Sequence, residues 1–281
     1  MNNSIKFTKM QGLGNDYIYV DCISQNIDDP LALSAQVSDR HFGIGGDGLI
    51  CISASDNADF RMDIYNADGS QAEMCGNGIR CVGKYVYDKG LTKKTELVVE
   101  TLAGLRYLNL HIDQNSVVSV TVDMGKPELD PQKIPVTLQK PICVNEPITV
   151  GSSLWNVTCV SMGNPHAVVF VADLEKVDIP AIGPLFENHS MFPNRINTEF
   201  VSIQDRNNIS MKVWERGSGE TLACGTGACA ATVASVLNGL TDRDIQVSLR
   251  GGTLKIKWDA ENDHVYMTGP AVSVFEGVLT I

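Results

Sequence analysis

Alternating apolar and polar residues mark the strands of this chain. Apolar residues at positions 60, 62 and 64 are separated by Arg61 and Asp63, and a similar alternation covers residues 209–214. A period of two is typical of a strand with one buried face. Residues 118–122 and 254–258 alternate in the same way, and a last strand is expected over residues 272–281.

Two longer apolar segments indicate helices instead. Residues 79–87 and 228–237 are mostly apolar, and Gly90 and Gly239 follow them, as is common after the last turn of a helix. The second segment is apolar on nearly every side, so we expect it inside a domain. Shorter helices are expected after Asp29-Pro30 and over residues 179–188.

The chain repeats itself at a spacing of 149 residues. Cys75-Gly76-Asn77-Gly78 and Cys224-Gly225-Thr226-Gly227 share the pattern C-G-x-G at this spacing. Without insertion or deletion, the same spacing relates Gly14-Asn15 to Gly163-Asn164, Asp29 to Asp178, Met62 to Met211 and Tyr65 to Trp214. These matches fall at turns and helix starts, where residue type is physically constrained, so they indicate a duplicated domain.

The repeat and the expected elements together predict an α+β fold. It has two pseudo-symmetric domains, each a mainly antiparallel or mixed β-sheet wrapped around a central helix. The boundary is expected near Gly125-Lys126-Pro127, so that residues 1–124 carry Cys75 and residues 125–269 carry Cys224. The last strand has no counterpart in the repeat that assigns it to either domain.

Composition and charge narrow the class of protein. The 281 residues include 22 Lys and Arg against 33 Asp and Glu, a formal net charge of −11. This balance argues against a nucleic-acid or membrane partner. No apolar signal segment follows residues 1–6, and no stretch is long enough to span a bilayer, so a cytoplasmic protein is expected.

The eight cysteines are expected to be free thiols. They are Cys22, Cys51, Cys75, Cys81, Cys143, Cys159, Cys224 and Cys229. A long chain without a signal peptide does not fit a secreted disulfide framework. Cys81 and Cys229 are interpreted as helix packing, and a metal site is disfavoured because the cysteine spacings match no short zinc knuckle.

Cys75 and Cys224 stand out because each begins an expected helix. Backbone N–H groups and the helix dipole stabilise a thiolate there, so a more acidic thiol is expected. The glycines beside each cysteine let amides approach a carboxylate. If the domains are related by a pseudo-two-fold axis, the two sulfurs face each other across a cleft, an arrangement typical of racemases and epimerases. No cofactor motif is present.

Longer motifs resemble the diaminopimelate epimerase family, which interconverts LL- and meso-diaminopimelate without a cofactor in lysine synthesis. The motifs are residues 10–17, 39–48, 65–70, 74–80, 162–166, 195–199 and 214–227, in that order. The resemblance extends over most of the chain. It implies that the C-terminal strand, residues 270–281, returns to the first domain, and that the protein is a homodimer acting on a small amino acid.

The resemblance also implies roles for individual residues. Cys224 would be the base toward the LL-substrate and Cys75 the proton donor, with Glu215 and His166 assisting catalysis. The implied substrate-binding residues are Asn15, Gly48, Asn66, Gly76, Asn77, Asn164, Asn197, Glu215, Arg216, Gly225 and Thr226. Some relatives have glutamine at position 48, so a backbone or water contact is expected at Gly48.

The sequence is also compatible with two other hypotheses about function. Proline racemases and hydroxyproline epimerases share the two-cysteine, two-domain plan, although their substrates would leave Arg216 and the side chains of Asn15, Asn66, Asn164 and Asn197 without a partner. A two-lobed protein that binds an amino acid without chemistry would explain a cleft, but it would not need two thiols at helix starts.

Overall fold

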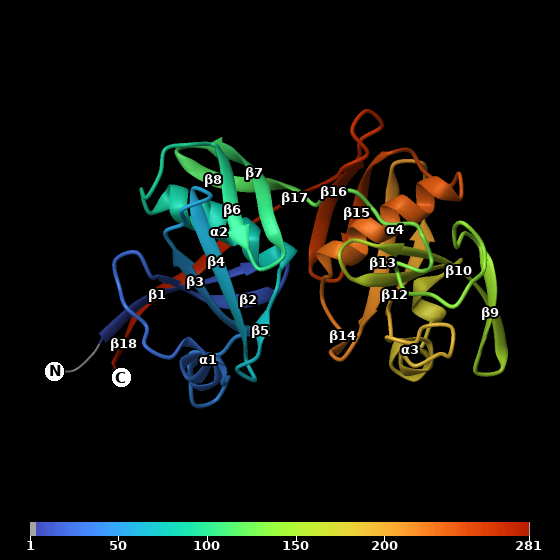
Figure 1. Ribbon diagram of the computed structural model, residues 1–281, viewed down its shortest axis with the longest axis horizontal. Coiled ribbons are helices and arrows are strands. Elements are labelled where there is room, and N and C mark those ends of the chain that lie inside the picture. Colours follow the sequence, from blue (N-terminus) through green and yellow to red (C-terminus); the bar gives the residue numbers. More distant parts are fainter. Residues whose placement is uncertain (1–3, 281) are drawn as a thin grey trace. The chain divides into compact units, whose positions relative to one another are not determined.

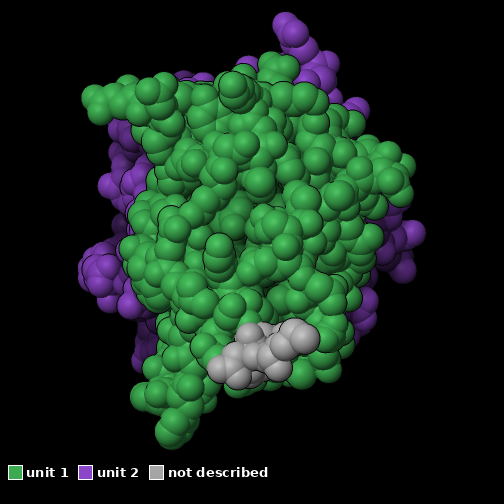
Figure 2. Space-filling model, turned by 90° about the vertical axis from the view of Figure 1, so that its left-hand side faces the viewer, with its two compact units in different colours: residues 1–122, 269–281 green, residues 123–268 purple. Residues whose placement is uncertain are grey.

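The computed structural model describes residues 4–280. Residues 1–3 and Ile281 lie outside the described part. Residues 1–3 belong to the N-terminal segment expected to lack a signal peptide, and Ile281 is the end of the expected last strand. The chain forms two compact units, which Figure 2 colours separately: Met1–Val122 with Gly269–Ile281, and Asp123–Thr268.

The first unit is a mixed sheet with two helices. Its strands are β1 (Ser4–Gly12), β2 (Asn15–Asp21), β3 (Gly48–Ser53), β4 (Phe60–Asn66), β5 (Gln71–Ala72), β6 (Glu96–Thr101), β7 (Gly104–Asp113), β8 (Ser116–Asp123) and β18 (Val272–Thr280). They pair in the order β18, β1, β2, β3, β4, β6, β7, β8, with β5 on β4. The β2–β3 and β4–β6 pairs are parallel and the others antiparallel. The helices are α1 (Pro30–Ser38) and α2 (Gly76–Asp88).

The second unit has the same plan. Its strands are β9 (Glu146–Val150), β10 (Ser153–Ser161), β11 (Pro165–Phe170), β12 (Asn197–Ile203), β13 (Asn208–Glu215), β14 (Gly219–Glu220), β15 (Asp244–Leu249), β16 (Gly252–Trp258) and β17 (Val265–Gly269). They pair in the order β9, β10, β11, β12, β13, β15, β16, β17, with β14 on β13. The helices are η1 (Leu174–Lys176), α3 (Ile179–Glu187) and α4 (Gly225–Leu237).

The two strand orders match pair by pair. The parallel pairs are β11–β12 and β13–β15, in the positions that β2–β3 and β4–β6 hold in the first unit. The registers match as well, because Tyr17 lies opposite Gly48 and His166 lies opposite Asn197, each 149 residues further along. The duplication and the expected α+β fold are therefore confirmed.

A central helix occupies the core of each unit, α2 in the first and α4 in the second, with strands around it (Figure 1). Each helix starts three residues before the apolar segment that predicted it, because Cys75 and Cys224 serve as N-caps. Gly90 and Gly239 follow the helices with φ of +72° and +69°, a conformation that glycine adopts without strain.

Helix α4 is buried along nearly all its length, as expected. Its two buried hydroxyl groups are satisfied within the helix, since Thr232 donates to the Ala228 carbonyl oxygen and Ser235 to that of Ala231. None of the described helices has the length and apolar character needed to cross a membrane.

The outer helices α1 and α3 begin at repeat-related aspartates. Asp29 accepts a hydrogen bond from the Ala32 N–H, and Asp178 accepts one from the Ala181 N–H. Below α3, the rings of Phe186 and Phe200 pack edge to face with centroids 5.5 Å apart. This packing supports β12 and β13, the strands that carry the polar residues of the second unit's site.

Candidate active site

The Cys75 half-site is built where α2 begins. The Cys75 sulfur accepts a hydrogen bond from the Gly78 N–H at 3.2 Å, and its thiol donates to Asn15 Oδ1, also at 3.2 Å. Asn15 is the first residue of β2, which places its amide beside the helix start. Gly76 and Asn77 form the first turn and are buried.

Gly48 and Asn66 lie directly opposite each other in the β3–β4 pair of the same unit. A Cβ atom at position 48 would collide with the Tyr65 carbonyl oxygen, so this backbone accepts only glycine there. The Asn66 amide donates to Ser70 Oγ at 3.0 Å within its own turn. A substrate contact at Gly48 stays a prediction.

The Cys224 half-site has the same backbone geometry with more charge around it. The sulfur accepts from the Gly227 N–H at 3.4 Å and lies 3.5 Å from Thr226 Oγ1. Glu215, the last residue of β13, accepts a hydrogen bond from the Thr221 hydroxyl. Glu215 also interacts with the Cys224 thiol.

His166 lies beneath this half-site and is fully buried. Its Nδ1 lies 2.7 Å from Glu199 Oε1, and its Nε2 lies 3.0 Å from Asn164 Oδ1. The parallel β11–β12 pairing brings these residues together. The imidazole is therefore held between a carboxylate and an amide, and it fixes the position of Asn164.

Burial and negative charge control Cys224. Burial raises the pKa of the Cys224 thiol well above its ordinary value, and the carboxylates of Glu215 and Glu199 raise it further, against the opposing hydrogen bonds from Thr226 and Gly227. The prediction of a more acidic thiol is therefore wrong for Cys224, because desolvation and nearby anions outweigh the helix dipole. Burial also raises the pKa of Glu215.

Asn197 and Arg216 meet through the backbone. Asn197 Oδ1 accepts from the Arg216 N–H at 2.9 Å, while its Nδ2 donates to the Pro165 carbonyl oxygen at 2.8 Å. The Arg216 guanidinium donates to the Asn194 carbonyl oxygen at 3.1 Å. The structure thus fixes the backbone at residue 216, and a clamp on a substrate carboxylate stays a prediction.

Two residues near the cysteines were not singled out from the sequence. Glu199 is fully buried between His166 and Cys224, and its signal is a charged residue inside the apolar strand over residues 197–203. Asp47 accepts a hydrogen bond from Asn15, and its signal is its place in the Gly-rich motif over residues 39–48, before β3.

The remaining cysteines lie away from helix starts. Cys81 and Cys229 are fully buried within α2 and α4, which confirms their interpretation as packing residues. Cys51, Cys143 and Cys159 are buried and Cys22 is half-buried. Within residues 4–280, no three His, Cys, Asp or Glu side chains are grouped so that they could hold a metal ion.

A model of the diaminopimelate epimerase family matches residues 7–129 and 158–274. The chain belongs to the diaminopimelate epimerase family. A diaminopimelate epimerase of Agathobacter rectalis is 58% identical, covering 99% of this chain and 100% of its own length. The diaminopimelate epimerase of Acetivibrio thermocellus is 56% identical over 97% of this chain and 98% of its own. The diaminopimelate epimerase of Methanococcus maripaludis is 56% identical, with 99% and 100% covered.

More distant solved structures share the fold of this diaminopimelate epimerase family member. A Bacillus anthracis phenazine biosynthesis protein of the PhzF family aligns with a TM-score of 0.71 at 17% identity, covering 99% of this chain and 100% of its own. A hydroxyproline epimerase of Agrobacterium vitis has a TM-score of 0.71 at 14% identity, covering 100% and 94%. Likeness at this identity is one of fold alone.

Proposed function

We propose that this chain interconverts LL-2,6-diaminopimelate and meso-2,6-diaminopimelate with two cysteines. One cysteine removes the α-proton, and the other returns a proton to the opposite face of the same carbon. The observation that carries the proposal is the pair of repeat-related cysteines, each an N-cap whose sulfur accepts a helix N–H. Family membership and relatives at 51–58% identity support the substrate. The product serves lysine and cell-wall precursor synthesis, and no cofactor is required.

In the proposed reaction the Cys224 thiolate removes the α-proton of the LL-substrate and becomes a thiol. The Cys75 thiol then delivers its proton to the opposite face of the same carbon and becomes a thiolate. The configuration inverts, and one proton has been taken up and one released. The reverse reaction exchanges the two roles, as a two-base mechanism requires.

Substrate charge is the proposed means of ionising Cys224. The pKa of its thiol is raised by burial and by the carboxylates of Glu215 and Glu199. A substrate ammonium group bound beside Glu215 would offset that negative charge and lower the cost of forming the thiolate. Glu215 is thus proposed to bind the amine, and His166 to position Asn164.

The helix starts are proposed to bind the carboxylate at the reacting carbon. The N–H groups of Gly76 and Asn77, and those of Gly225 and Thr226, lie in first helical turns. Such amides stabilise the charge that develops as the α-proton leaves, which is the difficult part of this reaction.

The rest of the substrate is assigned to polar side chains and one glycine. They are Asn15, Gly48, Asn66, Asn164, Asn197 and Arg216. The planar guanidinium of Arg216 suits a bidentate bond to the distal carboxylate. We also propose that the protein is a homodimer and acts in the cytoplasm.

Turnover with three candidate substrates tests this assignment. Purified protein without added cofactor is expected to convert LL-diaminopimelate to the meso form and to leave L-proline and trans-4-hydroxy-L-proline unchanged. Turnover of either proline would assign the chain to the other epimerase class. Binding of diaminopimelate without turnover, unaffected by Cys75→Ala, would show a binding protein instead.

A further inference from the structure

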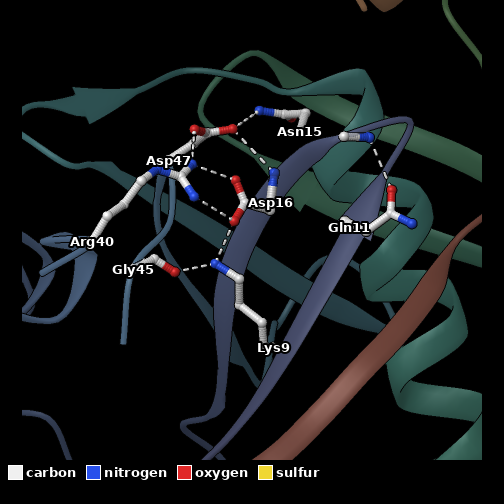
Figure 3. A network of polar contacts seen from close by, with 8 residues as sticks. Lys9, Gln11, Asn15, Asp16, Arg40, Gly45 and Asp47 are labelled. Carbon is white, nitrogen blue, oxygen red and sulfur yellow. Dashed lines mark hydrogen bonds and ion pairs between the residues drawn. The ribbon is translucent and has the colours of Figure 1, made fainter. Parts of the chain in front are cut away.

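Asn15 is hydrogen-bonded to a network of charged side chains in the first unit (Figure 3). Asn15 Nδ2 donates to Asp47 Oδ2 at 2.7 Å. Asn15 Oδ1 accepts from the Cys75 thiol at 3.2 Å. The amide therefore bridges a carboxylate and the proposed proton donor.

The chemistry of Asp47 sets the direction of that amide. An ionised carboxylate only accepts hydrogen bonds, so the NH2 group of Asn15 must point to it. The oxygen of the same amide then points to the sulfur. An oxygen in this position stabilises a thiol by accepting a hydrogen bond from its S–H group. It destabilises a thiolate because its lone pair then faces the negatively charged sulfur.

Asp47 is itself held from two sides. Its Oδ2 accepts from the Asp16 N–H at 3.0 Å, and its Oδ1 accepts from Arg40 Nη2 at 3.0 Å. Arg40 also binds both oxygens of Asp16, at 2.7 and 3.1 Å. The buried Lys9 ammonium binds Asp16 Oδ2 at 2.6 Å and the Gly45 carbonyl oxygen. Every contact that fixes Asp47 is charge-assisted or made by the backbone.

We propose that Asp47 is a positioning residue that fixes the Asn15 amide with its oxygen toward Cys75 and so keeps Cys75 protonated as the acid of the reaction. The acid role of Cys75 rests on the proposed function. The orientation of the Asn15 amide follows from the contacts of Asp47 and does not depend on the proposed function. The residue acts through Asn15, since it is the amide that contacts the sulfur.

The repeat gives an internal comparison. Asn164 is the counterpart of Asn15, yet its Oδ1 faces the ring of His166. The counterpart of Asp47 is Ile196, which cannot orient an amide. The two asparagines are therefore held by different partners, and the amide oxygen that meets a sulfur belongs to the Cys75 half-site.

Two titratable groups that interact with Cys75 have pKa values raised away from neutral pH. Tyr19 and Cys81 both interact electrostatically with Cys75. Burial raises the pKa of Tyr19 well above its ordinary value and that of Cys81 to about 11. Arg80 donates to the Gly76 carbonyl oxygen at the start of α2. A shift in Cys75 titration on changing Asp47 would therefore not arise from the ionisation of Tyr19 or Cys81.

The test follows alkylation of Cys75 by iodoacetamide as a function of pH. Trypsin releases residues 62–80, a peptide with Cys75 as its single cysteine, so mass spectrometry reads this thiol alone. Asp47→Asn is expected to lower the pH midpoint of alkylation by about 0.5–1 unit, which is about 3- to 10-fold faster reaction near neutral pH. The full-length protein is used, with folding checked by circular dichroism.

Asp59→Asn is the matched control. Like Asp47, Asp59 accepts from a basic side chain and from a strand N–H: from Lys94 Nζ at 2.6 Å and from the Val98 N–H at 2.8 Å. It lies outside the contacts of Asn15, and its substitution is expected to leave the midpoint unchanged. An unchanged or raised midpoint in Asp47→Asn would overturn the proposal.

A double-mutant cycle separates positioning from simple loss of charge. Asn15→Ala removes the amide oxygen and is expected to lower the midpoint by itself, which also serves if Asp47→Asn does not fold. Adding Asp47→Asn to Asn15→Ala should then give little further shift. A full additional shift would mean that Asp47 acts by charge alone and would contradict the proposal. Because alkylation needs no substrate, these results stand whether or not diaminopimelate is turned over.

Discussion

At the scale of single residues, the two cysteines share a backbone setting and differ in their side-chain neighbours. Cys75 faces the amide oxygen of Asn15, whereas Cys224 lies near the carboxylates of Glu215 and Glu199. The helix start alone therefore does not determine how readily each sulfur ionises. The two sulfurs are therefore expected to ionise differently, in line with the separate roles proposed for them.

Removing the charge of Glu215 should make Cys224 ionise more easily while impairing catalysis. Glu215 raises the pKa of Cys224, second only to burial. Glu215→Gln is therefore expected to lower the pH midpoint of Cys224 alkylation by up to about one unit. Turnover should fall because the proposed amine contact is lost.

The control for this variant is Glu220→Gln. Glu220 pairs with Arg250 at 2.8 Å and has no role in the proposed mechanism. Its substitution should leave both readouts unchanged. A raised Cys224 midpoint in Glu215→Gln, or undiminished turnover, would contradict the electrostatic account.

Asp16 should contribute to stability at neutral pH and lose that contribution in acid. Burial alone would raise its pKa, but hydrogen bonds and charges from Arg40 and Lys9 leave the pKa below its ordinary value of 3.8. A carboxyl with a lowered folded-state pKa stabilises the fold above the unfolded pKa, and this stabilisation is lost as pH falls through the folded value. Asp16→Asn should lower Tm at pH 7 and have a much smaller effect near pH 3. Equal Tm losses at both pH values would show that packing, and not charge, is responsible.

The residues that repeat could be predicted from the sequence, and those defined by cross-strand contacts could not. Cys75 and Cys224 follow from one motif written twice. Glu199 approaches His166 only because β11 and β12 are parallel neighbours, and Asp47 reaches Asn15 only through a loop. Neither contact leaves a periodic signal along the chain.

At the scale of elements, capping residues determine where the helices begin. The apolar segments alone place α2 and α4 from residues 79 and 228, whereas the C-G-x-G motifs placed each helix start at its cysteine, and both helices begin at the glycine directly after it. Apolar periodicity cannot detect a first turn made of Gly, Asn and Thr. The short strands β5 and β14, two residues each, were likewise too short to predict from alternation.

The repeated aspartate caps should each stabilise their helix. Asp178→Ala removes the acceptor for the Ala181 N–H and is expected to lower the free energy of unfolding by about 1 kcal/mol. Asp178→Asn retains an oxygen acceptor and should cost much less. Urea unfolding of both variants measures the difference, and equal losses would show that the cap hydrogen bond is not what stabilises α3.

At the scale of the whole molecule, duplication explains why one description fits both units. Strand order, parallel pairs and register recur at 149 residues, and the polar residues of the two half-sites recur with them. The family and the fold were predictable because motifs and repeat agree along the chain. The side chains that contact the two sulfurs are one place where the copies differ.

Mild oxidation should link the sulfurs of Cys75 and Cys224. The proposed mechanism needs both within reach of one α-carbon, so an oxidant is expected to join Cys75 to Cys224 and abolish turnover until a thiol reductant is added. Cys75→Ala should prevent the crosslink. Full activity in protein shown to carry this disulfide would contradict the two-cysteine mechanism.

The most direct test of the central claim is solvent deuterium exchange. LL-diaminopimelate is incubated in D₂O with wild type, Cys75→Ala and Cys224→Ala, and meso product and α-deuterium are followed together. The two-cysteine account predicts meso product that carries solvent deuterium at the inverted carbon in wild type, and loss of epimerisation in both variants. Meso product from either alanine variant at the wild-type rate, or product without solvent deuterium, would contradict it.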